Sequence, residues 1–475
     1  MSINISYYVA LLVVTVGASF ATTAAEARGK ESRTPEQQVL DAAFAGTDKA
    51  DSSTIADLEN RKIRSSFLED LLTDTDKKKK LNRRGFTIKN AIFDEPLNLS
   101  GVDVPVAVLL VHCTFNKEVK FSSAHFHFLL DLTESEFTDA KAMLNFNGLM
   151  VDDLFNINKI KAAGDAQFFR MKIGGDLFAS EATFSNPNSS IQFGETRVKG
   201  KMFLGPNKID GQEYGPSEFD GALSLADVKT LGLKLSCVIV KGDLDLGHAT
   251  IQTVLGVPGQ CPETMSAASA QRRSLPNSVI LEGLTYKDLE GGVGPGLLGL
   301  IDRSKDYSER SYTQLESYYR THADPDAADE VFLHMKDRER KQLFCQITHP
   351  KRKRSLFNPF SWLPWLWSWV LRILVGYGRR PEYALYYSFG VVIIGAFIFR
   401  HRTCVVPRRP DDQPQNYNPF WYSFDLLTPF IDLHQADTWM PRQDWRFGRN
   451  YAHLHRILGW ILVPIGIAAI TGIIK

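Results

Sequence analysis

A short apolar pattern recurs about every eleven residues between Phe86 and Ile251. Each copy reads apolar, any, apolar, any, any, small, any, apolar; its first, third and eighth positions are apolar everywhere except at Gln212 and Thr230. The fifteen copies begin at Phe86, Leu97, Val108, Val119, Leu130, Leu144, Phe155, Ala166, Leu177, Ile191, Met202, Gln212, Leu223, Leu233 and Leu244. Such self-similarity predicts a repeat architecture in which each unit packs on its neighbours.

The alternation within one copy is typical of a β-strand, because successive side chains on a strand point to opposite faces. A strand of three or four residues cannot bury its apolar side alone, but stacked copies bury it together. Two copies give about 22 residues, a suitable length for one coil. We therefore expect an all-β solenoid over 86–251, with small sixth-position residues such as Ala91 and Ser135 at tight corners.

Several phrases carry a family resemblance: NAIF at 90–93, PLNLSG at 96–101, GDLDL at 242–246, LEGLTY at 281–286 and YTQL at 312–315. In these phrases and in its C-terminal tail the chain resembles bacterial pentapeptide-repeat-like membrane-associated proteins, a family sometimes labelled membrane-associated oxidoreductase. The resemblance implies a right-handed β-helix, that is, a pentapeptide-repeat-like solenoid, followed by a membrane region. It implies no settled activity.

The oxidoreductase label can be tested on one motif, because GPGLLG at 294–299 matches GxGxxG. A dinucleotide site needs this motif between a strand and a helix. The preceding LEGGV at 289–293 does not read as a buried strand, and Pro295 favours a loop. We interpret 252–304 as a loop or linker and predict no cofactor.

The cysteines show no CxxC spacing that would indicate redox chemistry or a zinc site. Cys113 occupies the small position of a repeat, which predicts buried packing. Cys237 and Cys261 are able to pair if the solenoid is exported to an oxidising compartment.

The N-terminal segment 1–27 reads as a signal peptide or an N-terminal anchor. An apolar run from Tyr7 to Ala21 precedes the small-residue tripeptide AEA at 25–27, and this is the shape of an export signal. The polar segment 28–84 follows. Its residues with helical spacing predict a helical N-terminal cap for the solenoid; they are Leu58, Ile63, Phe67, Leu68, Leu71 and Leu72.

The C-terminal part predicts a membrane attachment. Segment 305–345 reads as a helical hairpin that caps the open end of the solenoid. Segment 346–380 is basic and rich in tryptophan, which favours a bilayer interface. The uncharged runs 383–399 and 457–474 predict two transmembrane helices. The residues expected to contact anionic lipid are Lys351, Arg352, Lys353 and Arg354.

The loop 400–456 between these runs contains a short apolar hairpin at 420–434. Its ionisable residues Asp425, Asp432 and His434 are functional or paired if they lie at membrane depth, or cap the hairpin if they lie at the surface. Basic residues flank both sides of the first run, so the charge rule gives conflicting topologies. The signal-like N-terminus favours a periplasmic β-helix on a multi-pass protein of the bacterial inner membrane.

The seventh position of the later copies points outward and often carries a base: Lys161, Lys172, Arg197, Lys208 and Lys229. Because copies two apart share a face, Lys172 and Arg197 are predicted on one side and the other three on another. Such a ladder can bind an anionic polymer or headgroup. The alternative, which the sequence favours, is a solvated charged edge that prevents sheet-to-sheet aggregation.

Two histidines, His125 and His127, are able to share the outer face of a strand, with Asp131 nearby. Metal binding usually requires further ligands at characteristic spacing. None is evident in the sequence, so we interpret both as solvated surface histidines and predict no metal.

The formal net charge of +1 gives no case for nucleic-acid binding. We expect a non-enzymatic scaffold of the bacterial cell envelope whose partners are membrane lipid and an unidentified protein or envelope component. Self-association into a homo-oligomer is left open. Two alternatives are a transport or signalling subunit that works through 420–434, and a glycan-active β-helix enzyme with carboxylates on an exposed ladder.

Overall fold

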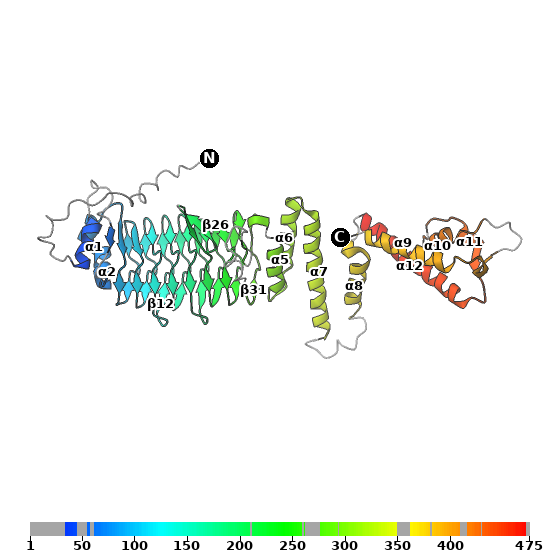
Figure 1. Ribbon diagram of the computed structural model, residues 1–475, viewed down its shortest axis with the longest axis horizontal. Coiled ribbons are helices and arrows are strands. Elements are labelled where there is room, and N and C mark those ends of the chain that lie inside the picture. Colours follow the sequence, from blue (N-terminus) through cyan, green and yellow to red (C-terminus); the bar gives the residue numbers. More distant parts are fainter. Residues whose placement is uncertain are drawn as a thin grey trace, which may run out of the picture. The chain divides into compact units, whose positions relative to one another are not determined.

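The computed structural model describes residues 34–44, 55–57, 61–209, 211–258, 261, 276–292, 294–348, 362–380, 382–408, 416–428 and 430–471. The chain divides into two compact units, Met1–His322 and Ala323–Lys475. The first unit contains the stacked strands and the second is largely helical (Figure 1). The predicted signal peptide or anchor at 1–27 and the basic cluster at 351–354 lie outside the described residues.

A parallel β-solenoid of about eight turns, with roughly 22 residues per turn, forms the first unit. This confirms the solenoid expected from the repeat. Each early turn contains four short strands, for example β2 (Phe86–Lys89), β3 (Ile92–Phe93), β4 (Leu97–Asn98) and β5 (Asp103–Val104). The strands stack in register along the axis, so that Phe86 pairs with Val108 and Leu97 pairs with Val119.

The strands form three parallel sheets, of which the largest covers two faces because β21 and β26 run through a corner. It contains β1 (Ile55–Asp57), β2, β5, β6 (Val108–Val111), β9 (His125–Phe126), β10 (Leu130–Asp131), β13 (Met150–Val151), β14 (Phe155–Asn156), β17 (Lys172–Ile173), β18 (Leu177–Phe178), β21 (Arg197–Phe203), β26 (Lys229–Lys234), β29 (Thr250–Ile251), β30 (Val254–Leu255) and β32 (Asp288–Leu289).

The two remaining parallel sheets have seven and eight strands. The first contains β3, β7 (Thr114–Phe115), β11 (Glu136–Phe137), β15 (Lys161–Ala162), β19 (Thr183–Phe184), β24 (Glu218–Phe219) and β27 (Ile239–Val240). The second contains β4, β8 (Val119–Lys120), β12 (Met143–Asn145), β16 (Asp165–Gln167), β20 (Ser190–Gln192), β25 (Ala222–Ser224), β28 (Leu244–Asp245) and β31 (Val279–Ile280).

The solenoid core consists of the repeat positions that the sequence marks as apolar. Phe86, Ile88 and Phe93 of the first copy are at most 1% exposed. The small sixth position is also buried, as at Ala91. The residue before it has a positive φ, for example Asn90 with φ 62°, and this left-handed conformation turns the chain at the corner.

One expected copy, that beginning at Gln212, is not a turn of the solenoid. Strands β22 (Asn207–Ile209) and β23 (Gln212–Tyr214) instead form an antiparallel hairpin. The hairpin interrupts the Met202 copy, which resumes at buried Ser217 and Phe219. The polar side chain of Gln212 at an expected core position was the sequence signal that the chain leaves the solenoid here. Thr230, the other exception, is buried in the core and its hydroxyl donates to the Gly200 carbonyl at 2.9 Å.

Helices cover the N-terminal end of the solenoid, as the sequence predicts. They are α1 (Pro35–Phe44), α2 (Ser65–Thr73) and α3 (Thr75–Lys80). Leu68, Leu71 and Leu72 of α2 are completely buried. Strand β1 pairs in parallel with β2 and so adds a strand before the first repeat.

The segment 252–304, expected as a linker, is largely structured where it is described. It contains β31, β32, a 3-10 turn η3 (Glu290–Gly292) and helix α5 (Gly294–Arg303). Leu297, Leu300 and Ile301 of α5 are buried. The glycine spacing of 294–299 had favoured a loop, but this segment belongs to the amphipathic helix α5. Helix α6 (Glu309–Thr321) follows it.

The second unit contains the helices α7 (Pro325–Thr348), α8 (Leu363–Val375), α9 (Glu382–Ile398), α10 (Pro419–Leu427), α11 (Gln435–Thr438) and α12 (Arg446–Ile470), with 3-10 turns η5 (Gly376–Gly378) and η6 (Arg402–Cys404). The expected helical pair of 305–345 corresponds to α6 and a longer α7. The expected loop 400–456 instead contains α10, α11 and an antiparallel pair of β33 (Val405–Pro407) and β34 (Trp439–Pro441).

The structure supports one of the two predicted transmembrane helices. Only one described helix, α12, is long and apolar enough to cross a membrane by itself, over 446–468. Helix α9 covers most of the expected first span, but its 17 residues are at the lower limit of the length that a crossing needs. Together α8 and α9 reach that length, but they meet at a bend of 113° and would form a broken span or a re-entrant loop.

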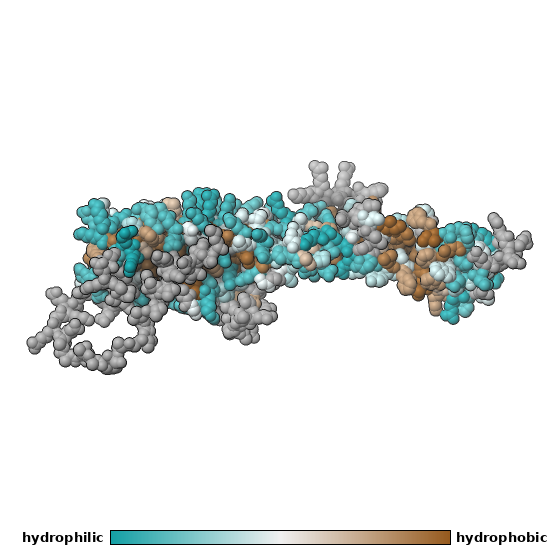
Figure 2. Space-filling model, turned by 90° about the horizontal axis from the view of Figure 1, so that it is seen from above, coloured by the Kyte–Doolittle hydropathy of each residue, from teal (hydrophilic) through white to brown (hydrophobic). Residues whose placement is uncertain are grey.

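Apolar side chains gather on the surface of the second unit (Figure 2). Phe389 and Phe397 of α9 and Trp460 and Ile461 of α12 are exposed. Helix α10 packs against α9 and α12, and the Ser423 hydroxyl donates to the Val392 carbonyl at 2.8 Å. The expected apolar hairpin is thus a helix packed beside the candidate span.

Candidate functional sites

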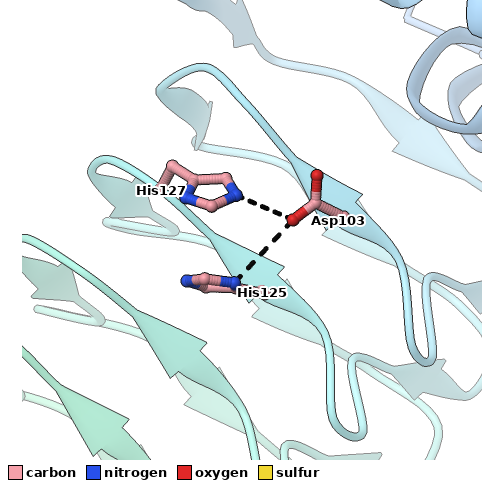
Figure 3. Close-up of side chains that lie close together, drawn as sticks. All are labelled: Asp103, His125 and His127. Carbon is pink, nitrogen blue, oxygen red and sulfur yellow. Dashed lines mark hydrogen bonds and ion pairs between the residues drawn. The ribbon is translucent and has the colours of Figure 1, made fainter.

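Four polar side chains from three successive coils meet on the outer surface of the solenoid. His125 begins β9 and His127 follows it, while Asp103 begins β5 one coil earlier and Asp152 follows β13 one coil later. The register pairs Asp103 with His125, and both imidazole rings lie beside Asp103 (Figure 3). We call these four residues the His–Asp cluster.

Each imidazole ring of the His–Asp cluster lies between two carboxylates. Asp103 Oδ1 lies 2.7 Å from His127 Nε2 and 3.7 Å from His125 Nδ1. On the other side, Asp152 Oδ1 lies 3.0 Å from His125 Nε2, and Asp152 Oδ2 lies 3.2 Å from His127 Nδ1. All four ring nitrogens therefore face carboxylate oxygens.

The surroundings of the His–Asp cluster are polar and solvent-accessible. Lys78 of α3 donates to the Asp103 carbonyl, and its Nζ lies 3.8 Å from Asp103 Oδ2. The hydrogen bond from His125, more than that from His127, lowers the pKa of the Asp152 carboxyl. Asp152 is therefore held as a carboxylate beside both rings.

Sequence reasoning missed two members of this cluster. Asp131, the expected neighbour, is occupied elsewhere: its Oδ1 accepts from the Thr133 amide at 2.8 Å. The coil length could have located both residues. Asp103 precedes His125 by one 22-residue coil, and Asp152 follows His127 by one coil that an insertion lengthens.

Three of the predicted basic residues form one row. The register pairs Lys172 with Arg197 and Arg197 with Lys229. Among the described residues, none of these three exposed side chains forms a close ion pair, although Arg197 interacts electrostatically with the Glu195 carboxylate, whose main partner is Arg170. We call them the basic row. On the same face the row continues toward the N-terminus through Met150 to His125.

The other two predicted bases lie elsewhere, so the expected grouping of Lys229 with them is wrong. Lys161 belongs to the seven-stranded sheet and its Nζ lies 2.6 Å from Glu136 Oε1. Lys208 belongs to the β22–β23 hairpin and lies 3.0 Å from Glu213. The extra copy assumed at Gln212 had shifted the phase of every later copy by half a coil.

The ionisable residues expected in the 420–434 hairpin close the turn between α10 and α11. Asp425 accepts from the backbone amides of Leu433 and Ala436 at 2.9 and 2.7 Å. Asp432 Oδ1 accepts from the His434 amide at 2.7 Å, and its Oδ2 lies 3.0 Å from His434 Nδ1. Asp432 and His434 are exposed. These contacts are those of capping residues.

The GxGxxG match has a packing explanation. A Cβ placed on Gly294 would lie 1.6 Å from Tyr319 Oη, so α5 and α6 approach each other closely at this residue. Helix α5 is followed by another helix and not by a strand of a parallel sheet. This is not the strand–helix–strand arrangement on which dinucleotides bind.

The cysteines fall into two groups. Cys113 is completely buried, as expected, and burial raises the pKa of its thiol to about 12, which makes it a poor nucleophile. Cys237 and Cys261 form a disulfide, the pairing that the sequence had left open.

The chain was compared with protein-family models, with curated proteins and with solved structures, and none of the three comparisons found a match. The resemblance to pentapeptide-repeat-like proteins therefore stays a prediction.

Proposed function

We propose that this chain is a membrane-anchored β-helical scaffold of the bacterial cell envelope. In this proposal the basic row of the solenoid binds an anionic polymer of the envelope, and α12 fastens the protein to the lipid. The protein binds and positions its partner and catalyses no reaction.

The basic row is the observation that carries the proposal. Neighbouring strands are ~4.8 Å apart, so the outer positions of Lys172, Arg197 and Lys229 are close enough for their charges to repel. Like charges on adjacent strands destabilise a sheet. An anionic polymer with closely spaced charges removes this repulsion, and three stacked cations offer it successive contacts.

Two further observations support the attachment and the compartment. Exposed apolar side chains such as Trp460 and Ile461 on α12 are expensive in water and suit a lipid environment. The Cys237–Cys261 disulfide favours an oxidising compartment. A solenoid on the periplasmic side of the membrane accounts for both.

The polymer-binding part can be tested with immobilised polygalacturonate and the detergent-solubilised full-length protein. We expect retention that falls with salt and is lost in Lys172→Glu/Arg197→Glu. The matched control is Lys161→Glu/Lys208→Glu, which changes the same charge on other faces and should retain binding. Equal loss of binding in both double variants would show that binding is not specific to the basic row. If the protein bound an immobilised acidic protein but not the polymer, the polymer would be excluded as its partner.

The anchoring part can be tested by cell fractionation. Removal of 446–475 should move the protein from the membrane fraction to the soluble fraction. Cysteine-accessibility labelling at positions 270 and 412 then reports the membrane side of the solenoid and whether α8 and α9 cross as a broken span. Labelling of position 270 only after cell lysis would contradict a periplasmic solenoid.

A further inference from the structure

With both imidazoles in the neutral form that binds metals, the His–Asp cluster has more acceptors than its own protons can satisfy. A neutral imidazole carries one N–H and one bare nitrogen lone pair. If His125 and His127 both donate to Asp152, then His125 Nδ1 and His127 Nε2 direct their lone pairs at Asp103 Oδ1. Two lone pairs and a carboxylate oxygen that converge on one region repel one another unless a proton or a cation lies among them, and a metal ion is able to contact all three atoms at once.

We propose that Asp103 Oδ1, His125 Nδ1 and His127 Nε2 bind a divalent transition-metal ion of the zinc class. Asp152 contacts the other nitrogen of each ring and positions both. The site is independent of the polymer-binding function proposed above.

The spacing of the donor atoms fits such an ion. Ligands about 2.0–2.1 Å from a tetrahedral zinc lie roughly 3.3 Å from each other. The two separations to Asp103 Oδ1, 2.7 and 3.7 Å, lie on either side of this value. Donor atoms from the three residues also lie within 4.8 Å of one another.

The outer contacts of Asp152 are those that metal-binding histidines normally make. Such histidines usually donate their second ring nitrogen to a carboxylate, which fixes the tautomer and the ring orientation. Here a single carboxylate serves both rings, at 3.0 and 3.2 Å. The backbone adds rigidity, because Asp103, His125 and Met150 pair in register across three coils.

The donor set also selects the class of ion. Two imidazoles with one carboxylate suit zinc and neighbouring transition metals, whereas calcium and magnesium prefer sites made of oxygen ligands. The half-exposed rings leave room for water as a fourth ligand. Lys78 does not replace the metal, since its charge approaches Asp103 Oδ2 and not the Oδ1 atom that faces the rings.

The test is zinc titration of EDTA-treated full-length protein, with cobalt absorption as a second readout. We expect one zinc per chain, at least about 100-fold weaker binding in Asp103→Asn and in His127→Gln, and 10–100-fold weaker binding in Asp152→Asn. The control is His112→Gln, because His112 forms an ion pair with Glu134 outside the cluster. It should bind zinc like the unmodified protein.

Three results would overturn the proposal. They are the absence of stoichiometric zinc binding, equal affinity for magnesium, and equal losses in the His112 and His127 variants. A loss in Asp152→Asn that exceeds the loss in Asp103→Asn would overturn the assignment of Asp103 as the ligand. Circular dichroism of each variant checks that the solenoid remains folded.

Discussion

Phe93 lies stacked on Phe115 in the solenoid core, with ring centroids 4.9 Å apart and ring planes within 4° of parallel. Phe115 stacks in the same way on Phe137, at 5.0 Å. Each ring occupies the eighth position of its copy and pairs with its equivalent one coil away. A ring in such a ladder supports two neighbours, so its loss affects three coils.

Phe115→Ala should therefore destabilise the solenoid by about 3–5 kcal/mol, because the cavity between two fixed rings cannot collapse. Urea unfolding followed by circular dichroism measures this change. Phe128→Ala is the control, since Phe128 is 47% exposed, and it should change stability by less than about 0.5 kcal/mol. Similar effects of both substitutions would contradict the ladder.

Gly294→Ala should destabilise the packing of α5 on α6 by about 1–3 kcal/mol, because the added methyl group overlaps Tyr319 Oη. Gly299→Ala in the same helix meets no atom within 4 Å and should stabilise α5 by about 1 kcal/mol through helix propensity. Thermal unfolding of the two variants should shift in opposite directions. If both glycines tolerated alanine equally, the close approach would be wrong.

The ion pair between Glu36 and Arg64 should give the N-terminal cap a pH-dependent stability. Two hydrogen bonds, at 2.8 and 3.0 Å, join the side chains, and they lower the pKa of Glu36 from its ordinary value of 4.5. A lowered carboxyl pKa stabilises the fold above the unfolded-state pKa, and this stabilisation is lost as the pH falls through the folded-state value.

Glu36→Gln should accordingly speed hydrogen exchange in α1 about two- to fivefold at pH 7, a small effect because the pair is largely exposed. The ratio of variant to unmodified protein should approach one as the pH falls from 4.5 through the lowered folded-state pKa of Glu36. Amides of the central strand β10 serve as the control and should not change. A ratio independent of pH would rule out the ion pair as the cause.

The thiol content of the protein should report the disulfide. The chain has five cysteines, and Cys113, Cys345 and Cys404 are free. Protein purified from an oxidising compartment and denatured without reductant should expose three reactive thiols, and reduction should expose five. Five thiols before reduction would exclude the Cys237–Cys261 bond.

The predictable part of this fold came from local periodicity. The alternation in copies such as Phe86–Phe93 depends only on which side chains can be buried, and a strand and its coil follow from that. The same reasoning failed at Gln212, where the spacing continued by coincidence through a hairpin. Periodicity does not show whether a segment lies on the core, and one miscounted copy moved Lys229 to the wrong face.

The membrane end was less predictable. The apolar content of 383–399 was recognised, but the bend before Glu382 and the packing of α10 on α9 depend on contacts between segments far apart in sequence. The GxGxxG spacing likewise gave no sign that Gly294 is needed for contact with Tyr319.

The sequence by itself determined that the chain winds into stacked coils, because burial of evenly spaced apolar residues requires it. Only the tertiary structure decided which outer residues become neighbours. Asp103, His125 and Asp152 are distant along the chain, and they meet because the register aligns them across successive coils, one of which is lengthened by an insertion. Outward-facing residues contribute little to burial, so their identities do not follow the repeat. The sequence pattern therefore does not show which of them become neighbours.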